Sequence, residues 1–114
     1  MRVMINGFGR IGRTMLRAWL QGGWPGLSIV AINDIADAET CAYLLEYDSV
    51  FGPLRESVEI AEGALIVAGH RLALTRQADL SRLDLRGIDL VAECTGKADS
   101  RESAERGLRA GARR

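Results

Sequence analysis

Three closely spaced glycines near the start of the chain could bind phosphate groups. Gly7, Gly9 and Gly12 form a Gly-x-Gly-x-x-Gly pattern between an apolar run and a helix-like pattern. In a dinucleotide site the first glycine allows a sharp turn, the second lets a pyrophosphate approach the backbone, and the third lets the helix pack on the strand. The first turn of that helix presents N–H groups and the positive end of its dipole to the phosphates. This stretch is therefore the candidate phosphate site.

An acidic residue follows at a spacing that suits the sugar of the same ligand. A second apolar run, Leu27–Ile32, ends at Asn33 and Asp34, and Asp34 lies 22 positions after Gly12. Roughly 20 positions separate the glycines from the acid that binds the adenosine ribose in dinucleotide folds. A carboxylate there would repel the additional phosphate of NADP, so the pattern favours NAD. The alternative is a glycine-rich turn followed by an aspartate that caps a helix.

The composition is that of a single globular domain. The 114 residues are 47% hydrophobic and carry no formal net charge, with acidic and basic residues interspersed. The lack of a basic field argues against nucleic acid or an anionic membrane as a partner. No apolar stretch suits a signal peptide or a membrane span, so we expect a cytoplasmic protein. Cys41 and Cys94 show no spacing typical of zinc or disulfides, and no metal is expected.

Two helices are expected to position the candidate residues. The first runs from about Arg10 to Gln21, and Arg13 and Arg17 fall outside its apolar face, in solvent. Asp37 opens the second helix, which should fade near Tyr47. The expected apolar face of the first helix consists of Ile11, Met15, Leu16, Ala18 and Leu20.

The middle of the chain is expected to form a loop and then a small antiparallel ribbon. Tyr47–Pro53 should be the loop. From Ser57 to Thr75 the apolar period shortens to about two residues, which predicts short strands with turns at Glu62–Gly63 and Gly69–His70. The last of these strands, His70–Thr75, should join the parallel sheet. His70 is the only histidine, and at a turn we expect it on the surface rather than in catalysis.

Further candidate residues follow two strands, at the edge of the sheet where ligands bind in open α/β folds. Arg76 follows the strand that ends at Thr75, and it fits equally well over an adenine ring or in solvent. After a short helical link at Ala78–Leu85, the strand Ile88–Cys94 is apolar enough to be covered on both faces. Thr95 and Gly96 come next and would allow close approach to the middle of a dinucleotide.

Taken together, these motifs resemble the amino-terminal half-domain of the phosphorylating glyceraldehyde-3-phosphate dehydrogenase family. Asn6, Phe8, Arg10 and Ile11 match the family as well as the glycines do, so the first motif is more specific than the glycine spacing alone. Erythrose-4-phosphate dehydrogenases share much of this pattern and stay an alternative. The matching segments, in the family's order, are 5–13, 31–34, 47–50 with Gly52, 93–96 and 110–112.

The resemblance implies a Rossmann-type doubly wound parallel sheet with strand order 3-2-1-4, an antiparallel ribbon insertion, and NAD as cofactor. It implies that Asp34 holds the adenine ribose with Asn33 beside it, and that Arg76 borders the adenine. Thr95 and Gly96 would shape the wall near the second ribose. The residues implied to line the pyrophosphate turn are Gly7, Phe8, Gly9, Arg10, Ile11 and Gly12.

The chain departs from the family at the adenine cleft. The family has an aromatic ring where this chain has Ala98, so less stacking area is expected for the adenine and NAD affinity should fall. Lys97 could meet a phosphate, but without other convergent basic groups a solvated lysine is the stronger interpretation. Gln77 and Ala78 replace the usual Asp-Pro pair.

The family's catalytic cysteine and histidine lie beyond the last residue of this chain, and neither cysteine here matches them. Cys94 is expected on a buried strand, where an apolar environment keeps a thiol inert. We therefore expect residues 1–114 to be an NAD-binding half-domain that does not oxidise an aldehyde alone, from a family whose full-length members form homo-oligomers. The alternatives are a stand-alone nucleotide-binding regulatory module and a remnant that does not bind.

Overall fold

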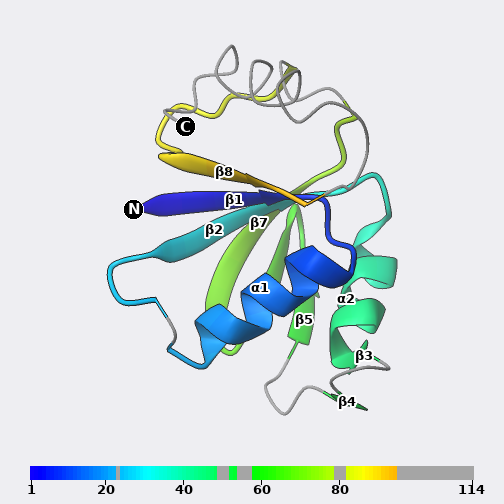
Figure 1. Ribbon diagram of the computed structural model, residues 1–114. Helices are drawn as coiled ribbons and strands as arrows, with labels where there is room; N and C mark the ends of the chain where they lie inside the picture. The colour runs from blue at the N-terminus through cyan, green and yellow to red at the C-terminus, as the bar shows by residue number, and fades with distance from the viewer. Residues whose placement is uncertain (23, 49–51, 54–57, 79–81, 95–114) are drawn as a thin grey trace.

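A six-stranded sheet with two helices packed against it is the framework of the protein (Figure 1). The computed structural model describes residues 1–22, 24–48, 52–53, 58–78 and 82–94. The elements in these residues are β1 (Arg2–Asn6), α1 (Arg10–Leu20), β2 (Ser28–Asn33), α2 (Ala38–Glu46), β3 (Tyr47–Asp48), β4 (Gly52–Pro53), β5 (Val58–Ala61), β6 (Ala64–Val67), β7 (His70–Thr75) and β8 (Leu90–Glu93).

The sheet has the strand order β5-β6-β7-β2-β1-β8. The pairs β7–β2, β2–β1 and β1–β8 are parallel, whereas β5, β6 and β7 pair antiparallel through hairpins. The parallel strands therefore follow the order 3-2-1-4, and the predicted doubly wound α/β fold with an antiparallel ribbon is confirmed. Because the four strands are parallel, their carboxyl ends meet at one edge of the sheet.

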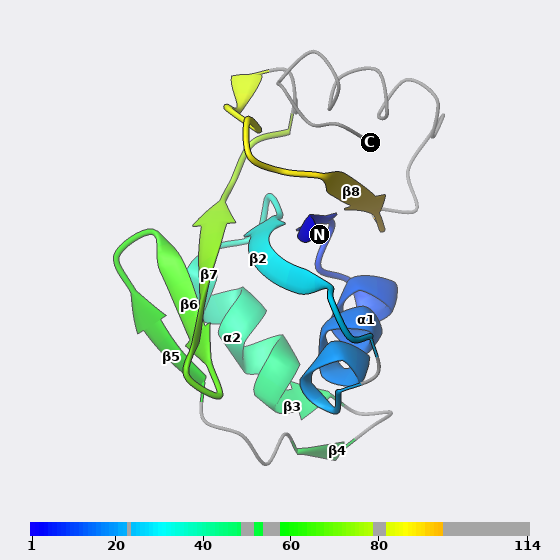
Figure 2. The same cartoon turned by 90° about the vertical axis from the view of Figure 1, so that its left-hand side faces the viewer.

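The core lies between the sheet and the two helices, which cover the same face (Figure 2). Side chains from β1, β2, β6 and β7 meet Leu16 of α1 and Leu45 of α2, and all are almost completely buried. On the other face a smaller cluster joins Met4 and Ala31 to Leu85 and Ile88 of the segment that leads into β8. Both faces of the central strands are thus covered, as expected for parallel strands.

The first helix keeps most of its predicted apolar face, because Leu16 is buried and Met15 and Leu20 pack against the core, but two positions differ. Gly12 and Leu16 face the core, while Ile11, predicted to be apolar and buried, is 66% exposed. Arg17, predicted in solvent, is only 9% exposed, and its Nη2 donates to the carbonyl of Leu45 over 2.6 Å. A cation at the carboxyl end of α2 is favourable because that end carries the negative side of the helix dipole. The packing of α1 against α2 therefore turns Arg17 inward.

Other differences are local. The predicted loop at Tyr47–Pro53 contains the short antiparallel pair β3–β4. The second turn of the ribbon lies at Ala68–Gly69, one residue earlier than predicted. His70 begins β7 as an exposed residue, as predicted, and its ring contacts Trp19 at a tilted angle, with the ring centroids 4.8 Å apart. The predicted link at Ala78–Leu85 lies partly outside the described residues. Strand β8 is half-buried rather than fully buried.

The turn between β6 and β7 offers a test of this geometry. Ala68 has φ +51° and Gly69 has φ +82°, a two-residue hairpin turn that favours Asn-Gly because alanine is strained at positive φ. We expect Ala68→Asn to raise the free energy of unfolding by about 0.5–1 kcal/mol, measured by urea denaturation. Ala68→Val should lower it, because a branched Cβ fits this region worst. A stabilised valine variant would contradict the turn geometry.

Candidate functional site

The glycine motif forms a tight bend between β1 and α1. Gly7 has φ +98°, and its N–H donates to the carbonyl of Asn33 over 2.8 Å. A Cβ on Gly12 would lie 2.3 Å from the Gly7 oxygen and 3.0 Å from Cγ2 of Ile5. Only a residue without a side chain lets α1 approach the end of β1 this closely. The predicted roles of Gly7 and Gly12 in the turn and the packing therefore agree with their positions.

The middle glycine leaves open space at the start of α1. Gly9 is the N-cap, with ordinary φ −77° and no side-chain capping bond, and a Cβ built on it meets no atom of the described residues within 4 Å. The first turn of α1 carries no acidic residue, so no carboxylate in that turn competes for the positive end of the helix. Backbone N–H groups, a positive dipole and free space together fit a bound phosphate group.

The carboxylate of Asp34 is held beside this bend by two backbone groups. The N–H of Phe8 donates to Oδ2 over 2.6 Å, and the N–H of Ala36 donates to Oδ1 over 2.9 Å. Asp34 is partly exposed, while the ring of Phe8 is buried in the core. Each carboxylate oxygen has a second lone pair, so the group can accept two further hydrogen bonds from a ribose diol.

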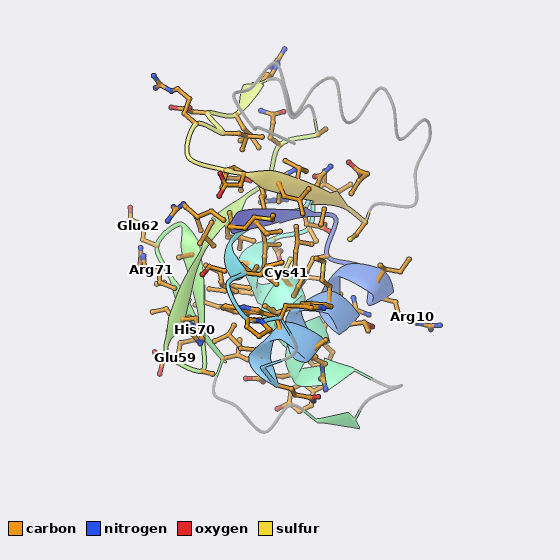
Figure 3. All side chains as sticks on the ribbon, turned by 60° about the vertical axis from the view of Figure 1, so that its left-hand side comes forward. Arg10, Cys41, Glu59, Glu62, His70 and Arg71 are labelled. Carbon is orange, nitrogen blue, oxygen red and sulfur yellow. The ribbon has the colours of Figure 1, made fainter. Side chains whose placement is uncertain are left out.

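The remaining predicted residues divide by location. Arg10 and Ile11 are exposed in the first turn of α1, and the side chain of Arg10 points outward (Figure 3). Arg76 is exposed at the same edge of the sheet, where its Nε and Nη2 donate to the carbonyl of Ile35 over 3.1 and 3.0 Å. Asn33 is only 2% exposed and directs its side chain into the protein. Thr95 and Gly96 lie outside the described residues, as do Lys97 and Ala98.

Sequence reasoning missed the side-chain contacts beneath this edge. Asn6 Oδ1 accepts a hydrogen bond from Asn33 Nδ2 over 2.8 Å, and Thr75 Oγ1 donates to Asn33 Oδ1 over 2.5 Å. The sequence does contain a polar residue at the end of each apolar strand. Such a residue indicates where a strand ends, but it does not reveal that the polar side chains of neighbouring strands form hydrogen bonds.

The two cysteines do not form a reactive site. Cys41 is 1% exposed in the core (Figure 3), and burial, with the charges of Asp34 and Asp37, raises the pKa of its thiol to about 11. Burial and the charge of Glu93 also raise the pKa of the half-buried Cys94 thiol. Both thiols are protonated near pH 7 and are poor nucleophiles. The described residues hold no cluster of three or more His, Cys, Asp and Glu suited to a metal ion.

The geometry can bind a pyrophosphate next to a ribose. The open space at Gly9 lies at the positive end of α1, and the bend that contains it is tied to the Asp34 carboxylate through Phe8. Positively polarised N–H groups suit the phosphates, and a carboxylate suits the sugar hydroxyls. The residues present therefore fit a dinucleotide.

None of the helices in the described part of the chain has the length and apolar character needed to cross a membrane.

Comparisons with known proteins point to one family. The family model described as the NAD binding domain of glyceraldehyde 3-phosphate dehydrogenase matches residues 1–101. Glyceraldehyde-3-phosphate dehydrogenase from Clostridium acetobutylicum is 47% identical, and the enzyme of that name from Thermotoga maritima is 44% identical. A relative from Leishmania mexicana named as cytosolic is also 44% identical. Each alignment covers 99% of this chain and 34% of the relative, so the chain spans about a third of the length of these relatives.

The protonated thiols give a test. Cys41 has a pKa raised from 9.0 to about 11 and is 1% exposed, so iodoacetamide should alkylate it at pH 8 at least about 100-fold more slowly in the folded chain than in urea. Its reaction should accelerate as the pH rises towards 11, because the thiolate fraction grows about tenfold per pH unit below the pKa. Mass spectrometry of the labelled peptides measures both rates. Equal labelling of folded and unfolded Cys41 at pH 8 would contradict the assigned environment.

The glycines of the bend should differ in their effect on stability. Gly12→Ala places a Cβ against the Gly7 carbonyl, and we expect it to lower the free energy of unfolding by about 3 kcal/mol. In Gly9→Ala the new Cβ meets no described atom within 4 Å, and the weaker N-cap is offset by a less flexible unfolded chain, so the free energy of unfolding should change by less than about 1 kcal/mol. Urea denaturation of both variants measures the contrast. Equal losses of stability would show that the spacing around the bend is misassigned.

Proposed function

Since the chain belongs to the family of NAD-binding domains of glyceraldehyde-3-phosphate dehydrogenases, we propose that its bend and Asp34 bind a single NAD molecule. The observation that carries this proposal is the 2.6 Å hydrogen bond from the Phe8 N–H to the Asp34 carboxylate. This bond joins the phosphate-binding bend to the ribose acceptor, so the two parts can contact one ligand at the same time.

Each residue at the edge has a proposed role. Gly9 leaves room for the pyrophosphate, and the first turn of α1, with Arg10 and Ile11, supplies N–H groups to it. Asp34 accepts hydrogen bonds from the adenine ribose, and the exposed guanidinium of Arg76 borders the adenine. We assign Thr95 and Gly96 to the wall near the second ribose on the family resemblance alone. When bound, NAD supplies the nicotinamide that accepts a hydride.

The same geometry supports a preference for NAD over NADP. The extra phosphate of NADP would lie on the ribose beside Asp34, where two like charges at close range repel each other. Because the Phe8 and Ala36 N–H groups hold this carboxylate, it cannot turn away without losing two hydrogen bonds. A phosphate beside it would therefore be disfavoured.

For the whole protein, we propose the activity named for its relatives, the phosphorylating oxidation of glyceraldehyde 3-phosphate. The chain would contribute the cofactor site, and no residue among its 114 is proposed as catalytic. Homo-oligomers and a cytoplasmic location are proposed on the same family grounds, and the cytosolic relative from Leishmania mexicana supports the location.

Calorimetric titration of the 114-residue chain with NAD tests the proposal. We expect saturable binding at one site, weakened at least about tenfold by Asp34→Ala, because charge-assisted hydrogen bonds to the ribose are lost. Gly9→Ala should weaken binding similarly while leaving the chain stable, because its Cβ fills the phosphate space. NADP should bind more weakly than NAD.

Asp84→Ala is the matched control, because Asp84 is exposed and pairs with Arg86 in the segment before β8. This variant should bind NAD as the wild type does. The proposal fails if millimolar NAD produces no heat of binding, or if Asp84→Ala and Asp34→Ala weaken binding equally.

A further inference from the structure

A row of side chains joins the carboxyl ends of the four parallel strands. Thr75 Oγ1 donates to Asn33 Oδ1 over 2.5 Å, and Asn33 Nδ2 donates to Asn6 Oδ1 over 2.8 Å. Asn6 Nδ2 in turn donates to Glu93 Oε2 over 2.8 Å. These residues are register partners across the sheet. The polar row consists of Thr75 (β7), Asn33 (β2), Asn6 (β1) and Glu93 (β8).

Asn33 uses every hydrogen-bonding position of its side chain within the protein. Besides its bonds within the polar row, Nδ2 donates to the carbonyl of Gln77 over 2.8 Å, and Oδ1 accepts the Gln77 N–H over 3.0 Å. A side-chain amide has two donor hydrogens and two acceptor lone pairs, so no capacity is left for a ligand. Fully satisfied buried networks make their surroundings rigid. Asn33 is therefore suited to hold its neighbours in place rather than to contact NAD.

Both ligand-facing parts of the site begin one residue beyond the polar row. Gly7 follows Asn6, and Asp34 follows Asn33. The Gly7 N–H donates to the carbonyl of Asn33 over 2.8 Å, and the Asp34 N–H donates to the carbonyl of Thr75 over 3.0 Å. A shift of one strand end against its neighbour would therefore change the separation between the bend and the carboxylate.

We propose that the polar row is a positioning device, with Asn33 at its centre, that fixes the bend and the Asp34 carboxylate at the separation a dinucleotide spans. The inference rests on the proposed NAD site and assigns Asn33 a role behind that site. NAD can contact the bend and the Asp34 carboxylate at the same time only if the two are correctly aligned. When they are, binding at one part raises the effective concentration of the ligand at the other, and the affinity increases. Adenosine has no phosphates and engages only the carboxylate side.

Two variants of the 114-residue chain separate positioning from stability. Asn33→Ala removes the centre of the row, and Thr75→Val removes a single hydrogen bond. Thr14→Val is the matched control, because Thr14 Oγ1 donates to the Arg10 carbonyl on α1, outside the row. NAD and adenosine are titrated by calorimetry at temperatures where each variant is folded, and amide hydrogen exchange is followed by NMR.

We expect Asn33→Ala to raise the Kd for NAD about tenfold or more and the Kd for adenosine less than about threefold, with Thr75→Val intermediate. Exchange of the Phe8 N–H should accelerate more than exchange at Leu72 in the core, because the bond from Phe8 to Asp34 spans the two positioned parts. Thr14→Val should leave the affinities for NAD and adenosine unchanged, and also the ratio of the exchange rate at Phe8 to that at Leu72.

The proposal is overturned if the row variants lower the Tm but keep the wild-type Kd for NAD and accelerate Phe8 and Leu72 equally, since the row would then contribute only stability. If Asn33→Ala does not fold, Thr75→Val decides between positioning and stability through the same measurements of the Kd for NAD and of exchange at Phe8 and Leu72. Should the wild-type chain fail to bind NAD, the proposed function fails, while the exchange ratio at Phe8 still decides whether the row positions the bend.

Discussion

The hydrogen bond between the Phe8 N–H and the Asp34 carboxylate is the contact on which the site depends. It joins the turn after β1 to the end of β2 over 2.6 Å. The bond can form only because β1 and β2 are parallel neighbours, which brings both carboxyl ends to one edge of the sheet. The second donor, the Ala36 N–H, fixes the other carboxylate oxygen. The proposed acceptor for a ribose is thus held in place by two backbone groups, and an acceptor that is already oriented lowers the cost of binding.

The position of α1 gives the bend its electrostatic character. The close contact of Gly12 with Gly7 brings the helix amino terminus up to the strand end, and Arg17 ties the body of the helix to the last turn of α2 through the Leu45 carbonyl. The helix dipole and the first-turn N–H groups therefore point at a fixed place. Positive potential at the bend and negative charge at Asp34 suit two different parts of one dinucleotide.

Local patterns predicted the fold well, because the glycine spacing and the apolar runs each depend on nearby sequence. The same patterns selected Gly7, Gly9, Gly12 and Asp34, which the structure brings together at one edge of the sheet. The prediction was wrong where tertiary contacts decide. Arg17 is turned inward by its bond to the Leu45 carbonyl of α2, and Ile11 is exposed, and neither follows from a helical period. The side-chain hydrogen bond between Asn6 and Asn33 was also missed, because 27 positions separate the two residues and only the strand register brings them together.

The central claim is that the bend and Asp34 contact the same bound molecule. Two-dimensional NMR of the isotopically labelled chain during titration with NAD tests it most directly. The account predicts saturable shifts of the Phe8, Gly9 and Asp34 amide signals that fit one common Kd, while signals from the β5–β6 hairpin stay in place. Separate dissociation constants at the bend and at Asp34, or shifts confined to other parts of the chain, would contradict it.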